Sequence, residues 1–190
     1  MSMHDDAMNG PPFDSFVARR LAAIDLCFRE GLFTESLVLL YAGIDALAWL
    51  ALPSGDVNGS DFVKWVNTYL LPDSGLQCTA EDIWAARCGL LHSSIAESRK
   101  SREGAAREIS YLLNDDGQAL VHVMANTPLP AINIRIDHLI AAFRKAIDSF
   151  QSAIGQQPEL ARQVYERARH HFYAGRFLKW NPDIFRYSEV

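Results

Sequence analysis

The chain has few cysteines and lacks the short motifs that mark the commonest nucleotide-binding proteins and hydrolases. Its three cysteines, Cys27, Cys78 and Cys88, have neither Cys-x-x-Cys nor Cys/His metal spacing, so we expect reduced thiols and no disulfide framework. The sequence contains no glycine-rich phosphate loop, no Gly-x-Ser-x-Gly elbow and no zinc signature. These absences remove the commonest nucleotide-binding and hydrolase alternatives.

An excess of positive charge is also missing. Lys and Arg number 18 against 23 Asp and Glu, a net charge of −5, so any binding of RNA must come from a local patch. The opening residues, MSMHDDAMNG, lack the basic and apolar regions of a secretory signal. The longest apolar run, Leu37 to Leu52, is shorter than the ~20 residues of a typical membrane span and contains Asp45. We therefore expect a cytoplasmic protein that does not contact a membrane.

What the sequence does contain is the apolar periodicity of helices. Apolar residues make up 49% of 190 positions, enough for one domain with a substantial core. Helical spacing that ends at Gly or Pro predicts a series of helices. Their approximate limits are 13–31, 35–52, 60–71, 79–98, 136–155 and 158–172. Ser60 is the expected N-cap of the third helix, and Thr79 with Asp82 resembles a capping box that opens the fourth.

A small β element is predicted between the fourth and fifth helices. Residues 107–113 and 118–125 alternate apolar and polar side chains, and Asn114-Asp115-Asp116-Gly117 between them is a strong turn signal. The predicted fold is therefore mainly all-α, an up-and-down bundle of about five to six helices with a β-hairpin insertion at about 107–125. We expect a disordered tail over 1–12, the bundle over 13–175 and a C-terminal extension over 176–190.

The fourth predicted helix carries an arginine and a histidine at close spacing. Residues Arg87 to His92 read Arg-Cys-Gly-Leu-Leu-His. Arg87 falls within the apolar arc of this helix, so it needs a buried partner or an interface. His92 lies about 140° around the helix from Arg87 and ~7.5 Å along its axis. A guanidinium can clamp a phosphate, and an imidazole that titrates near neutral pH can carry a proton. Together they indicate a site that could cleave RNA without a metal.

Asp45 poses the matching problem on the preceding apolar helix. A carboxylate in the middle of such a helix would cost several kcal/mol if it had no partner. We therefore expect Asp45 to pair with Arg87, which would hold the guanidinium in place for a phosphate.

These features resemble those of a known family. An Arg-x4-His motif late in an amphipathic helix, after an apolar helix that reads Tyr-Ala-Gly-Ile-Asp-Ala-Leu-Ala (Tyr41 to Ala48), resembles the HEPN domains (higher eukaryotes and prokaryotes nucleotide-binding) over roughly Phe13 to Phe172. The resemblance implies a helical bundle that dimerises. Many HEPN members are metal-independent endoribonucleases of toxin–antitoxin, phage-defence or RNA-processing systems. The motif residues of the family match Arg87 and His92.

The resemblance also implies a mechanism. Two copies of the motif would face each other across a two-fold interface, so that each active cleft is built from both chains. One His92 would take the proton from a ribose 2′-hydroxyl, the other would protonate the leaving 5′-oxygen, and Arg87 would stabilise the phosphorane. The expected products are a 2′,3′-cyclic phosphate and a 5′-hydroxyl, and DNA should survive. No cofactor is expected.

Other residues near the motif have supporting roles in this interpretation. Asp45, Cys88 and Ser93 would support the site, because Cys88 is small and Ser93 adds a hydroxyl beside the imidazole. The basic residues that follow could bind the RNA backbone, and the alternative for them is a solvated loop. They are Arg99, Lys100 and Arg102. The expected partners are RNA, a second copy of the chain and an antitoxin protein.

Two alternatives stay open. Cys88 stands where the family commonly has Asn, Asp or His, and some HEPN members are inactive, so the second hypothesis is a catalytically inactive bundle that binds a protein or a nucleotide. The adjacent His170 and His171 suggest a metal site at first sight. On a helix they point about 100° apart and no partner stands at ligand spacing, so no metal is expected.

Overall fold

The computed structural model describes residues 12–93, 106–113 and 131–171. This part of the chain is mainly α-helical with one small two-stranded sheet, as predicted. In chain order the elements are α2 (Pro12–Arg29), α3 (Phe33–Leu50), α4 (Gly59–Trp65), the π-helix η1 (Val66–Leu70), α5 (Ala80–Ser93), β1 (Glu108–Leu112), β2 (Ala131–Arg135), α7 (Ile136–Gln156) and α8 (Pro158–His171).

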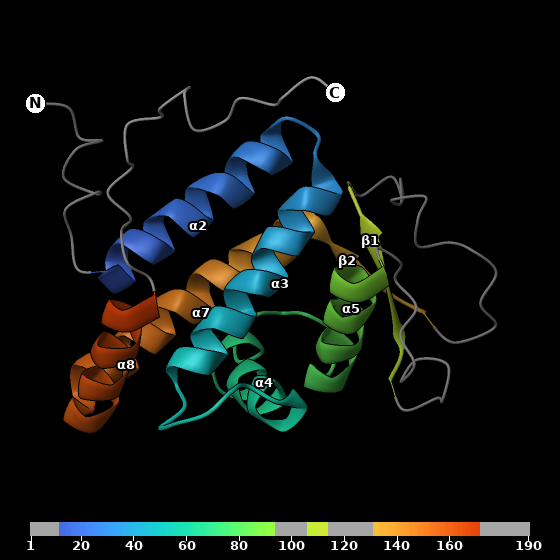
Figure 1. The fold of residues 1–190 in the computed structure, drawn as a ribbon. Helices are drawn as coiled ribbons and strands as arrows, with labels where there is room; N and C mark the ends of the chain where they lie inside the picture. Colours follow the sequence, from blue (N-terminus) through green and yellow to red (C-terminus); the bar gives the residue numbers. More distant parts are fainter. Residues whose placement is uncertain (1–11, 94–105, 114–130, 172–190) are drawn as a thin grey trace, which may run out of the picture.

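Helix α3 is the centre of the fold. It packs against α2, α4, α5, α7 and α8, and α2 and α5 lie on opposite sides of it (Figure 1). By length and composition α3 could cross a membrane, but half of its residues are buried inside the fold. Neighbouring helices therefore cover much of its apolar surface, which is the arrangement of a core helix.

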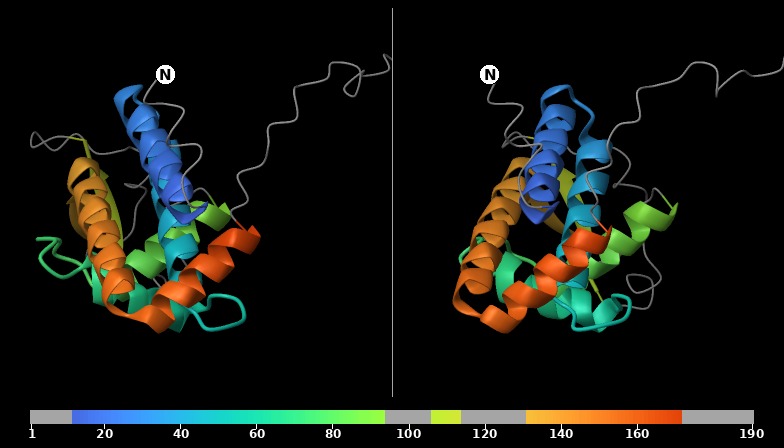
Figure 2. Two further views of the ribbon diagram at one scale, coloured as in Figure 1. Left: turned by 90° about the vertical axis from the view of Figure 1, so that its left-hand side faces the viewer. Right: turned by 60° about the vertical axis from the view of Figure 1, so that its left-hand side comes forward.

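The periodic apolar residues of the long helices form the core, as their spacing predicts. All six residues of the α7 seam are buried, namely Ile136, Ile140, Phe143, Ile147, Phe150 and Ile154. Helix α2 ends before Gly31, whose φ of 75° suits a glycine that stops a helix. Helix α8 packs against α2, α3 and α7 (Figure 2).

The start of α4 differs from the prediction. Its N-cap is Asn58, whose side-chain oxygen accepts hydrogen bonds from the backbone N–H groups of Ser60 at 2.8 Å and Asp61 at 3.2 Å. The carboxylate of Asp61 accepts the Asn58 N–H in return. Ser60 is therefore already helical, because Asn58 and Asp61 complete a capping box two residues earlier than expected.

The β-hairpin prediction is wrong in its pairing. The strand predicted over 107–113 is present as β1, but its partner is β2 and the two run parallel, with Glu108 opposite Ala131 and Leu112 opposite Arg135. A tight turn can join only antiparallel neighbours. Strand β2 lies beside β1 and leads directly into α7. The predicted second strand, 118–125, lies outside the described residues.

A buried pair of tyrosines ties the sheet to the central helix. The hydroxyl groups of Tyr41 on α3 and Tyr111 on β1 are 2.5 Å apart and both side chains are buried. Burial raises the pKa of both phenols. Both hydroxyls therefore stay protonated, and one donates to the other.

Candidate functional site

Arg87 and Asp45 meet, as the sequence predicts. The Nε and Nη2 atoms of Arg87 donate to Oδ2 of Asp45 at 2.8 and 2.6 Å. Each side chain is 17% exposed, so the pair lies at the edge of the core. This contact joins α5 to α3 and fixes the guanidinium.

Trp84 holds the guanidinium from another side. The Arg87 guanidinium carbon is 5.0 Å from the centroid of the Trp84 ring, a cation–π distance. The indole packs against Phe62, with ring centroids 5.0 Å apart, and against Gly59, where a Cβ would come within 3.1 Å of the indole nitrogen. Trp84 and Arg87 are three residues apart on α5, which places their side chains on the same face of the helix.

The pair borders an open hollow of about 390 Å³. Four residues on one face of α3 form its floor. Two residues of the loop after α3, together with Arg87, form its sides. The lining is Ala42, Asp45, Ala46, Trp49, Asp56, Val57 and Arg87. Ala42 and Ala46 have smaller side chains than Asp45 and Trp49, which leaves space over this face of α3. A ligand in this hollow meets an apolar floor beside an arginine.

Helix α8 fixes the loop at the edge of the hollow. The Arg167 guanidinium carbon lies 3.8 Å from the Trp49 ring centroid, and its N–H groups donate to the carbonyls of Leu52 at 3.2 Å and Gly55 at 2.8 Å. Gln163 donates to the Leu50 carbonyl at 3.1 Å. These carbonyls follow or end α3, where helical partners are missing. These contacts could not be predicted from the sequence, because residues so far apart in the chain share no local pattern.

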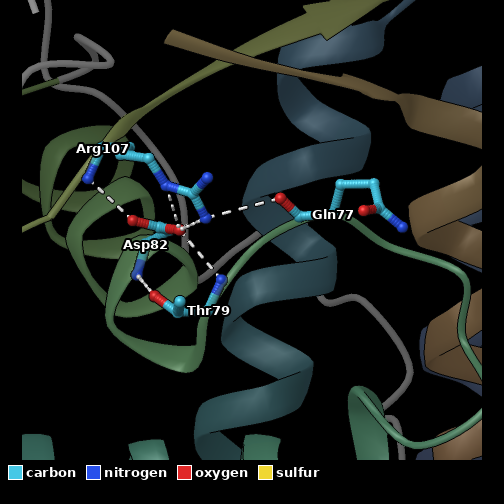
Figure 3. A network of polar contacts seen from close by, with 4 residues as sticks. All are labelled: Gln77, Thr79, Asp82 and Arg107. Atoms are coloured by element: carbon cyan, nitrogen blue, oxygen red, sulfur yellow. Dashed lines mark hydrogen bonds and ion pairs between the residues drawn. The ribbon is translucent and has the colours of Figure 1, made fainter. Parts of the chain in front are cut away.

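A polar network at the N-terminus of α5 sets the direction of the helix that carries Arg87 (Figure 3). The predicted capping box is confirmed, because Asp82 Oδ2 accepts the Thr79 N–H at 2.9 Å and Thr79 Oγ1 accepts the Asp82 N–H at 3.2 Å. Asp82 also accepts the Arg107 backbone N–H at 2.7 Å and the Arg107 Nη2 at 2.7 Å. The network thus binds α5 to the residue that precedes β1.

The same network determines the charge of Asp82, which is 2% exposed. Burial by itself raises the pKa of its carboxyl, but hydrogen bonds from Thr79 and Arg107 outweigh this effect and leave the pKa below its ordinary value. The carboxylate therefore stays ionised and bonded at neutral pH.

The buried face of α5 consists largely of small side chains. Trp84, Cys88 and Leu91 on this helix are only partly buried. Its buried apolar residues are Ala80, Ile83, Ala85 and Ala86. Small side chains allow α5 to approach its neighbours closely, which places Arg87 at the edge of the core and not inside it.

The other predicted site residues are placed less fully. Cys88 follows Arg87 and is partly exposed. His92 and Ser93 belong to the last turn of α5, and their side chains lie outside the described part. Arg99, Lys100 and Arg102 also lie outside it. Of the predicted set, the structure brings together Arg87 and Asp45.

Within the described residues, no three His, Cys, Asp or Glu side chains are grouped so that they could hold a metal ion. Comparison of the chain with protein-family models, with curated proteins and with solved structures finds no match. The function of the chain is therefore inferred from the geometry around Arg87 and from the motif that contains it.

Proposed function

We propose that the chain is a HEPN-like, metal-independent endoribonuclease that cleaves RNA by transesterification through the ribose 2′-hydroxyl. The observation that carries the proposal is the fixed position of Arg87, between the Asp45 carboxylate and the Trp84 ring at the edge of an open hollow. A guanidinium oriented before substrate arrives can stabilise charge on a phosphorane without reorganisation.

His92 supplies the proton transfers in this proposal. It follows Arg87 by five residues in the same helix, and a facing His92 from a second copy completes the acid–base pair. Arg99, Lys100 and Arg102 bind the RNA backbone. The proposed setting is the cytoplasm, in a stress, toxin–antitoxin or phage-defence system, with an antitoxin protein as a further partner.

The direct test is cleavage of an end-labelled RNA by the purified protein in EDTA. Wild type should yield 2′,3′-cyclic phosphate and 5′-hydroxyl ends, and the DNA of the same sequence should stay intact. His92→Ala and Arg87→Ala should reduce the rate by at least about a hundredfold. His138→Ala is the matched control, because His138 is exposed on α7. Equal background cleavage by all four proteins would defeat the proposal.

Cys88 supports a second candidate, a catalytically inactive HEPN-like bundle that binds a protein or a nucleotide. The position after the arginine is commonly polar in active members, and Cys88 offers no strong hydrogen bond. In that case a folded wild type would not cleave RNA, and binding of a partner would be equal in wild type and His92→Ala.

A further inference from the structure

Arg20 of α2 lies apart from the Arg87 site. Its Cγ is 3.4 Å from the position that a Cβ on Gly43 of α3 would occupy. Gly43 and Asp45 are two residues apart on α3 and therefore point about 200° away from each other. Arg20 and Arg87 accordingly contact opposite sides of α3, where Figure 1 shows α2 and α5.

The surroundings of Arg20 are apolar. Its guanidinium carbon is 5.3 Å from the ring centroid of Phe16, which is 9% exposed. The neighbours of Gly43 one turn along α3 are Leu40 and Leu47, both buried. Burial lowers the pKa of Arg20, as expected for a cation that has lost part of its hydration.

Every other partly buried arginine of the described part has an acceptor for its guanidinium. Four of them bond to a carboxylate and Arg167 bonds to backbone carbonyls. The four are Arg87, Arg107, Arg135 and Arg144. Arg20 has neither kind of acceptor among the described residues. The next acidic residue along α2, Asp25, is bound to Arg144.

A second arginine, Arg19, lines the same surface as Arg20. Arg19 is exposed, and its Nε donates to the Ser15 carbonyl at 3.2 Å, which directs the side chain back along α2. Both arginines line a hollow of about 240 Å³ together with Phe16 and Ala23. None of these four lining residues carries a carboxylate, so the hollow has two adjacent positive charges.

We propose that Arg19 and Arg20 form a binding site for a phosphate monoester dianion. Two guanidinium groups offer forked N–H donors that suit phosphate oxygens, and their charge of two matches the dianion. A carboxylate or a phosphodiester carries a single negative charge and balances only one of them. The ligand supplies the acceptors that Arg20 lacks and relieves the repulsion between the neighbouring cations. A phosphate of this kind belongs either to a free nucleotide or to the end of an RNA.

The test is isothermal titration of the full chain with inorganic phosphate and with a nucleoside 5′-monophosphate, at pH 7.5 and low salt. We expect saturable binding of both ligands to wild type. The Kd should be at least about tenfold higher for Arg20→Gln and for Arg19→Gln. Arg169→Gln, at an exposed arginine of α8, should bind as wild type does. Dimethyl phosphate, a monoanion, should bind at least about tenfold more weakly than inorganic phosphate.

A parallel titration identifies the source of the phosphate. An RNA with a 5′-phosphate and the same RNA with a 5′-hydroxyl are compared on His92→Ala, so that cleavage does not interfere. If the phosphorylated RNA binds more tightly, and Arg19→Gln removes this difference, the site belongs to RNA ends. If only the nucleotide binds, the site belongs to free nucleotides. Absence of saturable phosphate binding, or equal binding by all variants, would overturn the site. Since Arg19 is exposed, its variant should fold even if Arg20→Gln does not.

Discussion

Arg87 donates two hydrogen bonds to a single carboxylate oxygen of Asp45, across 42 residues of sequence. Each of these residues would be costly at its position without the other, since one is a cation and the other an anion at the edge of an apolar core. The pair therefore sets how α5 lies against α3, and with it the position of the whole Arg87 to His92 segment.

Asp45→Ala should lower the free energy of unfolding by about 1–3 kcal/mol, because it leaves a partly buried guanidinium without its carboxylate. Urea denaturation followed by circular dichroism measures the change. Asp56→Ala removes an exposed carboxylate from the same hollow and should change stability by less than about 0.5 kcal/mol. Equal effects of the two substitutions would show that the ion pair does not stabilise the fold.

Tyr41→Phe and Tyr111→Phe should each destabilise the protein by about 1–3 kcal/mol, because each leaves the other buried hydroxyl without its partner. The double variant removes both hydroxyls, so its loss should be smaller than the sum of the two single losses. A double-mutant cycle from denaturant unfolding gives the coupling. Strict additivity would mean that the hydroxyl contact contributes nothing.

Asp82 should make stability depend on pH in the acid range. Its pKa in the fold lies below the ordinary value of 3.8, so its contribution is present above that value and is lost as the pH falls through the folded pKa. The stability difference between wild type and Asp82→Asn should therefore be largest near pH 7 and should narrow below about pH 4. Urea unfolding at a series of pH values measures it. The same stability difference between wild type and Asp82→Asn at every pH would contradict the prediction.

Gly43→Ala should destabilise the protein by about 1–3 kcal/mol. A Cβ at this position would come within 2.8 Å of the buried Phe143 ring, so either the ring or the two helices must shift. Gly155→Ala is the matched control, since nothing lies within 4 Å of a Cβ there. In a helix it should be neutral or stabilising by up to roughly 1 kcal/mol. Thermal unfolding of both variants distinguishes close packing from the general effect of replacing glycine.

The sequence allowed the helices to be predicted because their signals are local. Apolar spacing located α7 and its core seam, and the Thr79 and Asp82 pair located the start of α5. The pairing of Asp45 with Arg87 was also predictable, since each is a charge in an apolar helix. The free-energy cost of an unpaired charge in an apolar helix requires a partner however far apart the two residues are in the sequence.

The parallel sheet and the Arg167 contacts were not predictable in this way. Each residue of β1 pairs with one 23 residues later in the chain, whereas the turn signal after β1 favoured a nearer partner. Three of the buried apolar residues of α5 are alanines, whose small side chains give only a weak apolar signal in the sequence. In the structure, close approach of the helices decides which face is buried, and close approach requires small residues.

The contacts of α8 have a consequence for the order of events during synthesis. The carbonyl groups at the end of α3 are bonded by side chains 113 and 115 residues later in the chain. A ribosome makes about 5–20 residues per second, so α3 and α5 both emerge seconds before Gln163 and Arg167 exist. During that interval Asp45 can already meet Arg87, but the loop that borders their hollow is not yet held. The chain therefore completes this hollow only after most of it has been translated.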